Sequence, residues 1–163
     1  MQQEMNVAGR LLGAVLVAGL VTGAAANAAP QKWARVLAPA GFSIDQPVGW
    51  RLSGAAGGGL MVDNQACPGR GAPLCDGGAE ITVRSEPVVA KPKAIRAKAC
   101  WSLQETLSET VDASGRRAEN NQLSCAIADR RFVLVERHLK GDKHAPNYGR
   151  FLIRMAKSLR YPG

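Results

Sequence analysis

A continuous run of apolar and small residues near the amino terminus constrains this chain most, because it indicates the compartment in which the chain folds. The run covers residues 11–26, follows a polar segment ending at Arg10, and leads into a small-x-small triplet at 26–28. This order is typical of a secretory signal peptide. Residues 1–28 are therefore predicted to be a signal peptide, and residues 29–163 a single exported domain. An uncleaved membrane anchor is the alternative, although the run is shorter than the roughly 20 strongly apolar residues of a spanning helix.

All four cysteines lie in the exported part of the chain. An even number of cysteines in an oxidising compartment indicates disulfides, and three pairings are possible. Cys67–Cys75 is favoured because the Gly/Pro-rich loop between the two residues needs a covalent cross-link to hold it. This pairing leaves Cys100 with Cys125. The chain has no C-x-x-C pair and no close ligand pair of the kind found in zinc sites. We therefore expect two disulfides, no metal and no cofactor.

Short apolar alternations separated by glycine and proline predict several β-strands. The segments with this pattern are 33–37, 42–45, 48–52, 60–62 and 79–85. Residues 53–59 include four glycines and predict a turn or a mobile loop. Residues 123–128 and 131–140 predict a hairpin, whose second arm is apolar on both faces, as in a central strand.

A spacing of four residues predicts an amphipathic helix in the middle of the chain. The apolar residues with this spacing are Ile95, Ala99, Leu103, Leu107 and Val111. Pro92 lies near the expected start, and Gly115 would provide a left-handed cap after the end. Basic residues lie at the front of this segment and acidic ones at the back, which opposes the helix dipole. Packing of the apolar stripe must outweigh that cost.

A second helix is predicted at the carboxyl end, because Pro146 is well placed in a first helical turn. Its apolar stripe comprises Tyr148, Phe151, Leu152, Met155 and Leu159. Strands, a helix, a hairpin and a terminal helix together predict an α+β fold. The expected architecture is a single domain in which an antiparallel β-sheet carries two main helices.

No complete catalytic or metal-binding motif occurs in the chain. His138 and His144 are candidates for a small secreted hydrolase, provided that a carboxylate lies within hydrogen-bond reach in a concave pocket. A half-exposed strand histidine is the favoured interpretation of His138. Asp63, Asn64 and Asp76 could line a cation site, although EF-hand spacing is absent and a solvated loop is favoured.

Positive charge is concentrated near the carboxyl end. Residues 130–160 contain nine basic and two acidic residues, so they contribute +7 of the formal net charge of +8. The residues expected to form a basic binding face are Arg137, Lys140, Arg150, Arg154, Lys157 and Arg160. Such a face favours an acidic protein or an anionic envelope component, whereas nucleic acid is not expected outside the cytoplasm. A solvated cationic surface is the alternative.

Both ends of the exported part resemble the PsbP-like superfamily. Gly41-Phe42-Ser43-Ile44, Pro47 and Gly49-Trp50 resemble its opening hairpin, and residues 151–159 its closing helix. The four cysteines and the glycine-rich segment depart from the pattern. The resemblance implies a non-enzymatic binding or assembly module and assigns no functional residue.

The sequence therefore predicts a periplasmic or secreted binding or accessory protein that acts through its basic carboxyl-terminal segment. No membrane-spanning segment is expected in the chain after signal cleavage. A small hydrolase is one alternative. An inhibitor or immunity-type protein that presents the Cys67–Cys75 loop is the other.

Overall fold

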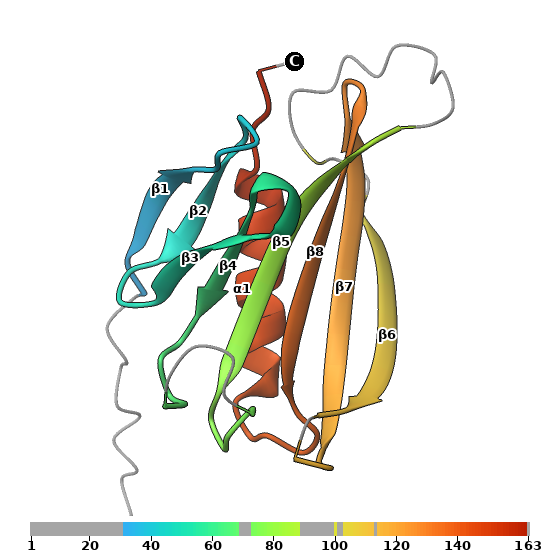
Figure 1. The fold of residues 1–163 in the computed structure, drawn as a ribbon. Helices are drawn as coiled ribbons and strands as arrows, with labels where there is room; N and C mark the ends of the chain where they lie inside the picture. The colour runs from blue at the N-terminus through green and yellow to red at the C-terminus, as the bar shows by residue number, and fades with distance from the viewer. Residues whose placement is uncertain (1–30, 69–72, 89–99, 101–102, 113, 163) are drawn as a thin grey trace, which may run out of the picture. The chain divides into compact units, whose positions relative to one another are not determined.

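A computed structural model describes residues 31–68, 73–88, 100, 103–112 and 114–162. The predicted signal peptide, residues 1–28, lies outside the described residues. Within these residues, six strands form one antiparallel sheet in the order β3-β4-β5-β8-β7-β6 (Figure 1). Their bounds are β3 Arg51–Ala55, β4 Gly59–Asp63, β5 Ala79–Pro87, β6 Gln104–Val111, β7 Arg117–Ile127 and β8 Arg130–Leu139.

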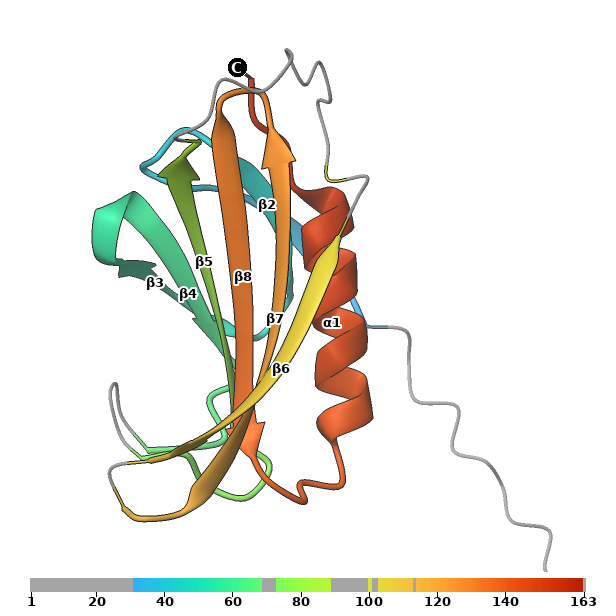
Figure 2. The same cartoon turned by 90° about the vertical axis from the view of Figure 1, so that its right-hand side faces the viewer.

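One helix, α1 (Ala145–Ser158), lies along one face of this sheet (Figure 2). The separate hairpin of β1 (Trp33–Leu37) and β2 (Ser43–Pro47) packs beside it. Ser43 and Arg160 exchange two backbone hydrogen bonds of 2.8 Å, which join β2 to the segment that follows α1. None of the helices in the described part of the chain is long and apolar enough to cross a membrane.

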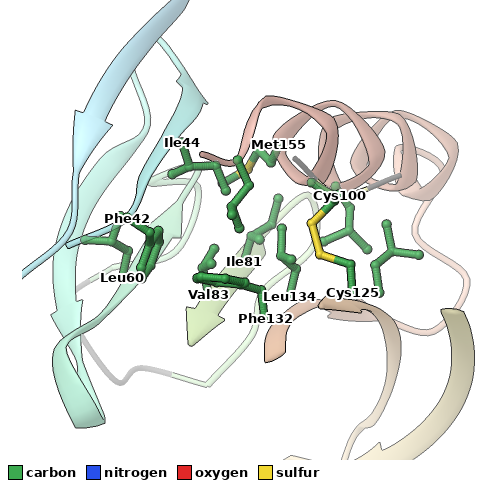
Figure 3. Close-up of a cluster of buried hydrophobic side chains, with 14 of the residues drawn as sticks. Phe42, Ile44, Leu60, Ile81, Val83, Cys100, Cys125, Phe132, Leu134 and Met155 are labelled. Atoms are coloured by element: carbon green, nitrogen blue, oxygen red, sulfur yellow. A yellow bond between two sulfur atoms is a disulfide. The ribbon is translucent and has the colours of Figure 1, made fainter. Parts of the chain in front are cut away.

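The main core lies between α1, the β1–β2 hairpin and the covered face of the large sheet. Figure 3 shows its central side chains, to which Phe42, Ile81, Phe132 and Met155 contribute. Phe42 and Phe132 are fully buried and meet edge to face, with ring centroids 5.4 Å apart. Burial of these side chains is the main contribution to stability in a domain of this size.

The predicted central helix is wrong in the part that the structure describes. Residues 104–111 form the edge strand β6, paired with β7 from Gln104↔Ser124 to Val111↔Arg117. A spacing of four residues brings side chains to one face of a helix, but also to one face of a strand, whose period is two. The β-branched residues Thr106, Thr110 and Val111 favour the strand. Residues 95–99 of the predicted helix lie outside the described residues.

The fold class is therefore corrected to a mainly antiparallel β-fold with one helix among the described residues, not two. Gly115 has φ +81° as predicted for a helix cap, but it lies in the β6–β7 turn. Asp112 Oδ1 holds this turn by accepting hydrogen bonds from the backbone nitrogens of Ser114 and Arg116, both 2.9 Å long. A hairpin turn thus takes the place of the expected helix end.

Several other predictions are confirmed. The β7–β8 hairpin forms, β8 is central between β5 and β7, and the last helix begins where Pro146 indicated. The turn predicted within 53–59 is present as a 3₁₀ turn over Ala56–Gly58, although the end of β3 and the start of β4 occupy the rest of this segment. A Cβ atom at Gly59 would collide with the carbonyl oxygen of Val83, so the strands approach closely there.

Both favoured disulfides are present, Cys67–Cys75 and Cys100–Cys125, each with a Cα–Cα distance of 5.5 Å. The second one links Cys125 on β7 to Cys100 within the core (Figure 3). Cys100 itself lies in neither a helix nor a strand, contrary to the prediction. The two bridges hold different parts of the molecule, because only Cys67–Cys75 closes a loop outside the main core.

Candidate functional site

The helix-covered face of β7 and β8 changes from apolar to polar towards the amino end of α1. Leu123 and Leu134 are paired across the strands and buried. The next pair on the same face is Asn121↔Glu136, and the one after it is Glu119↔His138. Side chains on one face of a strand recur every two residues, so this polar cluster continues the same surface as the core.

Glu119, Glu136 and His138 form a hydrogen-bonded group, here called the histidine cluster. His138 Nδ1 lies 2.7 Å from Glu136 Oε1, and His138 Nε2 lies 3.2 Å from Glu119 Oε2. Glu136 is 1% exposed and His138 is 5% exposed. A buried carboxylate is costly unless it is paired, so His138 is the partner that makes the position of Glu136 tolerable.

The environment changes the proton affinity of both buried members of the cluster. Burial raises the pKa of Glu136, although its hydrogen bond with His138 opposes this. The hydrogen bond to Glu136 raises the pKa of His138, although burial opposes this, and the charges of Glu136 and Glu119 add to the rise. An imidazole between two carboxylates therefore holds its proton more tightly than a free one does.

A second set of polar contacts packs against the cluster from the amino end of α1. Tyr148 contacts the His138 ring, at a centroid distance of 5.8 Å, and donates its hydroxyl to the Gly77 carbonyl at 2.8 Å. Gly77 in turn donates its backbone N–H to Asp142 Oδ2 at 3.0 Å. Burial, together with the charge of Asp142, raises the pKa of Tyr148 to about 12. These contacts tie the loop next to the Cys67–Cys75 bridge to the helix.

A groove of about 440 Å³ opens beside the histidine cluster. Its lining residues are Leu107, Ser108, Glu109, Glu119, Asn120, Asn121, Glu136, His138 and Ala145. Leu107 is 74% exposed, and Glu109 is paired with Lys140. The groove thus combines carboxylates with apolar contact from Leu107 and Ala145.

The predicted basic residues do not gather on one face. Arg150, Arg154 and Lys157 lie on the exposed side of α1 and form what is here called the cationic helix face. The Arg154 guanidinium stacks over the Trp33 ring at 4.4 Å. Arg160 follows the helix and donates to the carbonyl oxygens of Lys157 and Leu159.

The other two predicted basic residues lie elsewhere. Arg137 alternates with the core residues of β8, so it lies on the uncovered face of the sheet, where it approaches Glu80 at 3.5 Å. Lys140 pairs with Glu109 next to the groove. The basic segment that is continuous in the sequence is therefore divided in space.

The residues considered for a cation site have structural roles. Asp63 accepts two hydrogen bonds of 2.9 Å from Arg51, and Asn64 donates to the Gly77 carbonyl at 2.6 Å. In the described part of the chain, no group of three or more His, Cys, Asp or Glu side chains is arranged to hold a metal ion. Asp76 lines a separate cavity of about 910 Å³ near the loop at 140–144.

His138 is buried rather than half-exposed, and its carboxylate partners were not identified from the sequence. The pattern Glu136-Arg137-His138 contained the signal, because residues two apart on a strand share a face. His144 meets no carboxylate through its ring in the described residues. Its backbone N–H donates to Asp142, and its ring lies 6.5 Å from that of Tyr148.

Comparisons with known proteins bear on the fold alone. No protein-family model matches the chain, and no curated protein matches it. Among solved structures, the chain is similar to a protein of Bacteroides thetaiotaomicron VPI-5482, with a TM-score of 0.53 and 13% identity. The match covers 79% of this chain and 48% of that protein, so the chain spans about half of its length. The arrangement of strands and helix therefore has a counterpart, without any indication of activity.

Proposed function

We propose that this chain is an exported, non-enzymatic binding or accessory protein that engages an acidic protein partner through the cationic helix face. The observation that carries the proposal is the charge of α1, which contains Arg150, Arg154 and Lys157 and no acidic residue. Among the described residues, none of these three side chains forms an ion pair. Three cations at helical spacing are thus available to a partner.

The rigidity of one cation favours a discrete protein partner over a diffuse anionic surface. Arg154 is held over Trp33 before any partner binds. A planar guanidinium that is already fixed loses little entropy when it forms paired hydrogen bonds with a carboxylate. The two disulfides are compatible with an exported protein, and a periplasmic or secreted location is part of this proposal.

The hydrolase alternative has less support. His138 does have carboxylate partners beside a groove, but Glu136 and Glu119 occupy both ring nitrogens. In the described residues, no hydroxyl or thiol forms a hydrogen bond with its ring, so the nucleophile that such a histidine would activate is missing. The inhibitor alternative depends on the tip of the Cys67–Cys75 loop, of which residues 69–72 lie outside the described part. Membership of the PsbP-like superfamily likewise stays a proposal.

Binding to poly-L-glutamate, as a model acidic polypeptide, tests the proposal at 50 and 500 mM salt. The test variant is Arg150→Gln/Arg154→Gln/Lys157→Gln. The matched control removes three positive charges from the uncovered sheet face, Arg84→Gln/Arg131→Gln/Arg137→Gln. We expect the test variant to lose at least tenfold in affinity and the control less than threefold, with high salt weakening wild-type binding.

Equal losses in the two variants would contradict the assignment to α1. A parallel measurement uses phosphatidylglycerol vesicles. If the wild-type chain binds the vesicles more tightly than poly-L-glutamate, the partner is an anionic membrane surface and the proposed protein partner is wrong.

A further inference from the structure

The large sheet ends at β6, whose outer side no strand of the described chain covers. β6 pairs with β7 in an unbroken register from Gln104↔Ser124 to Val111↔Arg117, and it is the last strand in the sheet order (Figure 1). In an antiparallel ladder, alternate residues of such a strand point their backbone N–H and C=O groups outward. The outer side of β6 is therefore a row of donors and acceptors with the spacing that a further strand requires.

β6 lacks the features that commonly protect a sheet edge. Edge strands are often short, or they carry proline, lysine or a bulge. β6 is eight residues long, has the sequence QETLSETV and pairs with β7 without a bulge. The opposite edge of the sheet, β3, is five residues long and contains Gly54. Of these two edges, β6 offers the longer and more regular template for strand addition.

The side chains of β6 define the kind of strand that suits this edge. All eight residues are exposed. The register places Glu105, Leu107, Glu109 and Val111 on the face towards α1, so that acidic and apolar residues alternate there. Leu107 is 74% exposed and Val111 is 67% exposed, which leaves most of their apolar surface in contact with solvent. Side chains directly opposite each other on neighbouring strands interact, so this alternation specifies the residues of an added strand.

The charge of the edge favours a basic strand over a second copy of this chain. Glu105 forms no ion pair in the described part of the chain, and Glu109 has Lys140 as its partner. Two β6 strands that paired with each other would bring the glutamates of both copies onto one face, which like-charge repulsion opposes. Lysine or arginine opposite Glu105 and Glu109 would instead provide the complementary charge.

We propose that β6 binds an extended segment of a partner protein, which adds to the sheet edge as an antiparallel strand. The segment carries basic residues opposite Glu105 and Glu109, and apolar residues opposite Leu107 and Val111. Backbone hydrogen bonds supply the affinity, and the alternate side chains supply the specificity. This surface shares no residue with the cationic helix face, so either proposal can fail without the other.

The first test uses the peptide Ile-Thr-Lys-Thr-Ile-Thr-Lys-Thr, acetylated and amidated, in an NMR titration of the full exported chain. The backbone N–H signals of β6 should shift, and the affinity should be about tenfold higher than that of the peptide with glutamate in place of lysine. Methylation of alternate backbone nitrogens of the peptide should abolish binding in one phase and preserve it in the other, because only alternate N–H groups face β6. Equal binding of the two methylated forms, or no shift at β6, would overturn the proposal.

Two variants with matched controls locate the contacts. Glu105→Lys should weaken binding of the lysine peptide about fivefold, whereas Asp129→Lys, which makes the same charge change at the β7–β8 turn, should change it less than about twofold. Leu107→Ser should weaken it about threefold. Leu37→Ser, at a leucine of β1 that is 73% exposed, should leave it unchanged. Equal losses in a variant and its control would refute the site.

A second copy of this chain is the competing occupant of the edge. In sedimentation velocity experiments, the chain alone should remain a monomer at concentrations well above the dissociation constant of the lysine peptide. A dimer that Leu107→Ser dissociates would show that β6 pairs with itself, and the proposed basic partner would then be wrong.

Discussion

The two ends of the β7–β8 hairpin use the same face of the same two strands in different ways. At the end near the strand turn, Leu123, Cys125, Phe132 and Leu134 are buried in the main core. At the other end, the histidine cluster replaces apolar contact with hydrogen bonds. The stability that comes from apolar burial does not depend on pH. The stability that comes from a buried carboxylate paired with an imidazole does, because both groups titrate. The hairpin thus has one end that stabilises the fold and one end whose energy depends on protonation.

The largest effect should come from the apolar end. Phe132→Ala removes a fully buried ring that meets Phe42 edge to face. The loss of transfer free energy and the cavity left behind should lower the free energy of unfolding by about 3–5 kcal/mol. Urea denaturation followed by tryptophan fluorescence would measure it. A loss below 1 kcal/mol would show that this end is not the main source of stability.

The two disulfides offer a matched comparison between the ends. Cys100 and Cys125 are 25 residues apart and lie in the core, whereas Cys67 and Cys75 are 8 apart, in a loop near the polar end. In the chain-entropy model, replacing the first pair with alanine should cost roughly 3.5 kcal/mol and the second roughly 2.5 kcal/mol. Thermal melts of the two double variants would give the order. The reverse order would mean that the loop beside Gly77 contributes more than its closure entropy.

The polar end should show a smaller and pH-dependent effect. The folded-state pKa of His138 is raised above 6.5, so the stabilisation from its proton is complete below pH 6.5 and is lost as pH rises through the folded-state value. His138→Gln should therefore cost on the order of 3 kcal/mol at pH 6, by leaving Glu136 without its cation, and less at pH 9. Urea midpoints at both pH values test this. An equal cost at pH 6 and pH 9 would exclude the imidazolium as the stabilising form.

The smallest effect is expected at the edge of the groove. Leu107 is 74% exposed on β6, so Leu107→Ser should change the free energy of unfolding by no more than about 0.5 kcal/mol. Urea denaturation of the variant beside the wild-type chain would measure the change. A large loss of stability would indicate that Leu107 packs against the fold.

Much of the apolar end could be predicted from the sequence, because alternation and the 123–140 hairpin define it directly. The histidine cluster could not, since the predicted first arm began at Leu123 and the strand actually begins at Arg117. Extending that arm by six residues, in the register set by the turn, would have placed Glu119 opposite His138. The central helix was predicted wrongly because a spacing of four residues fits the period of a helix, about 3.6 residues, and also the two-residue period of a strand. Its adverse charge order and its β-branched residues Thr106, Thr110 and Val111 were the local signs against a helix.

The position of β8 has a consequence for the order in which the chain can fold. Only α1 follows this strand in the order of elements, yet the strand pairs with β5, some fifty residues earlier, and with β7 directly before it. During synthesis from the amino end, β3, β4 and β5 emerge long before the strand that joins them to the other half of the sheet. The complete sheet can assemble only after residue 139 has emerged, and α1 can cover it only after that. Such a chain can therefore close its core only in the last stage of its synthesis.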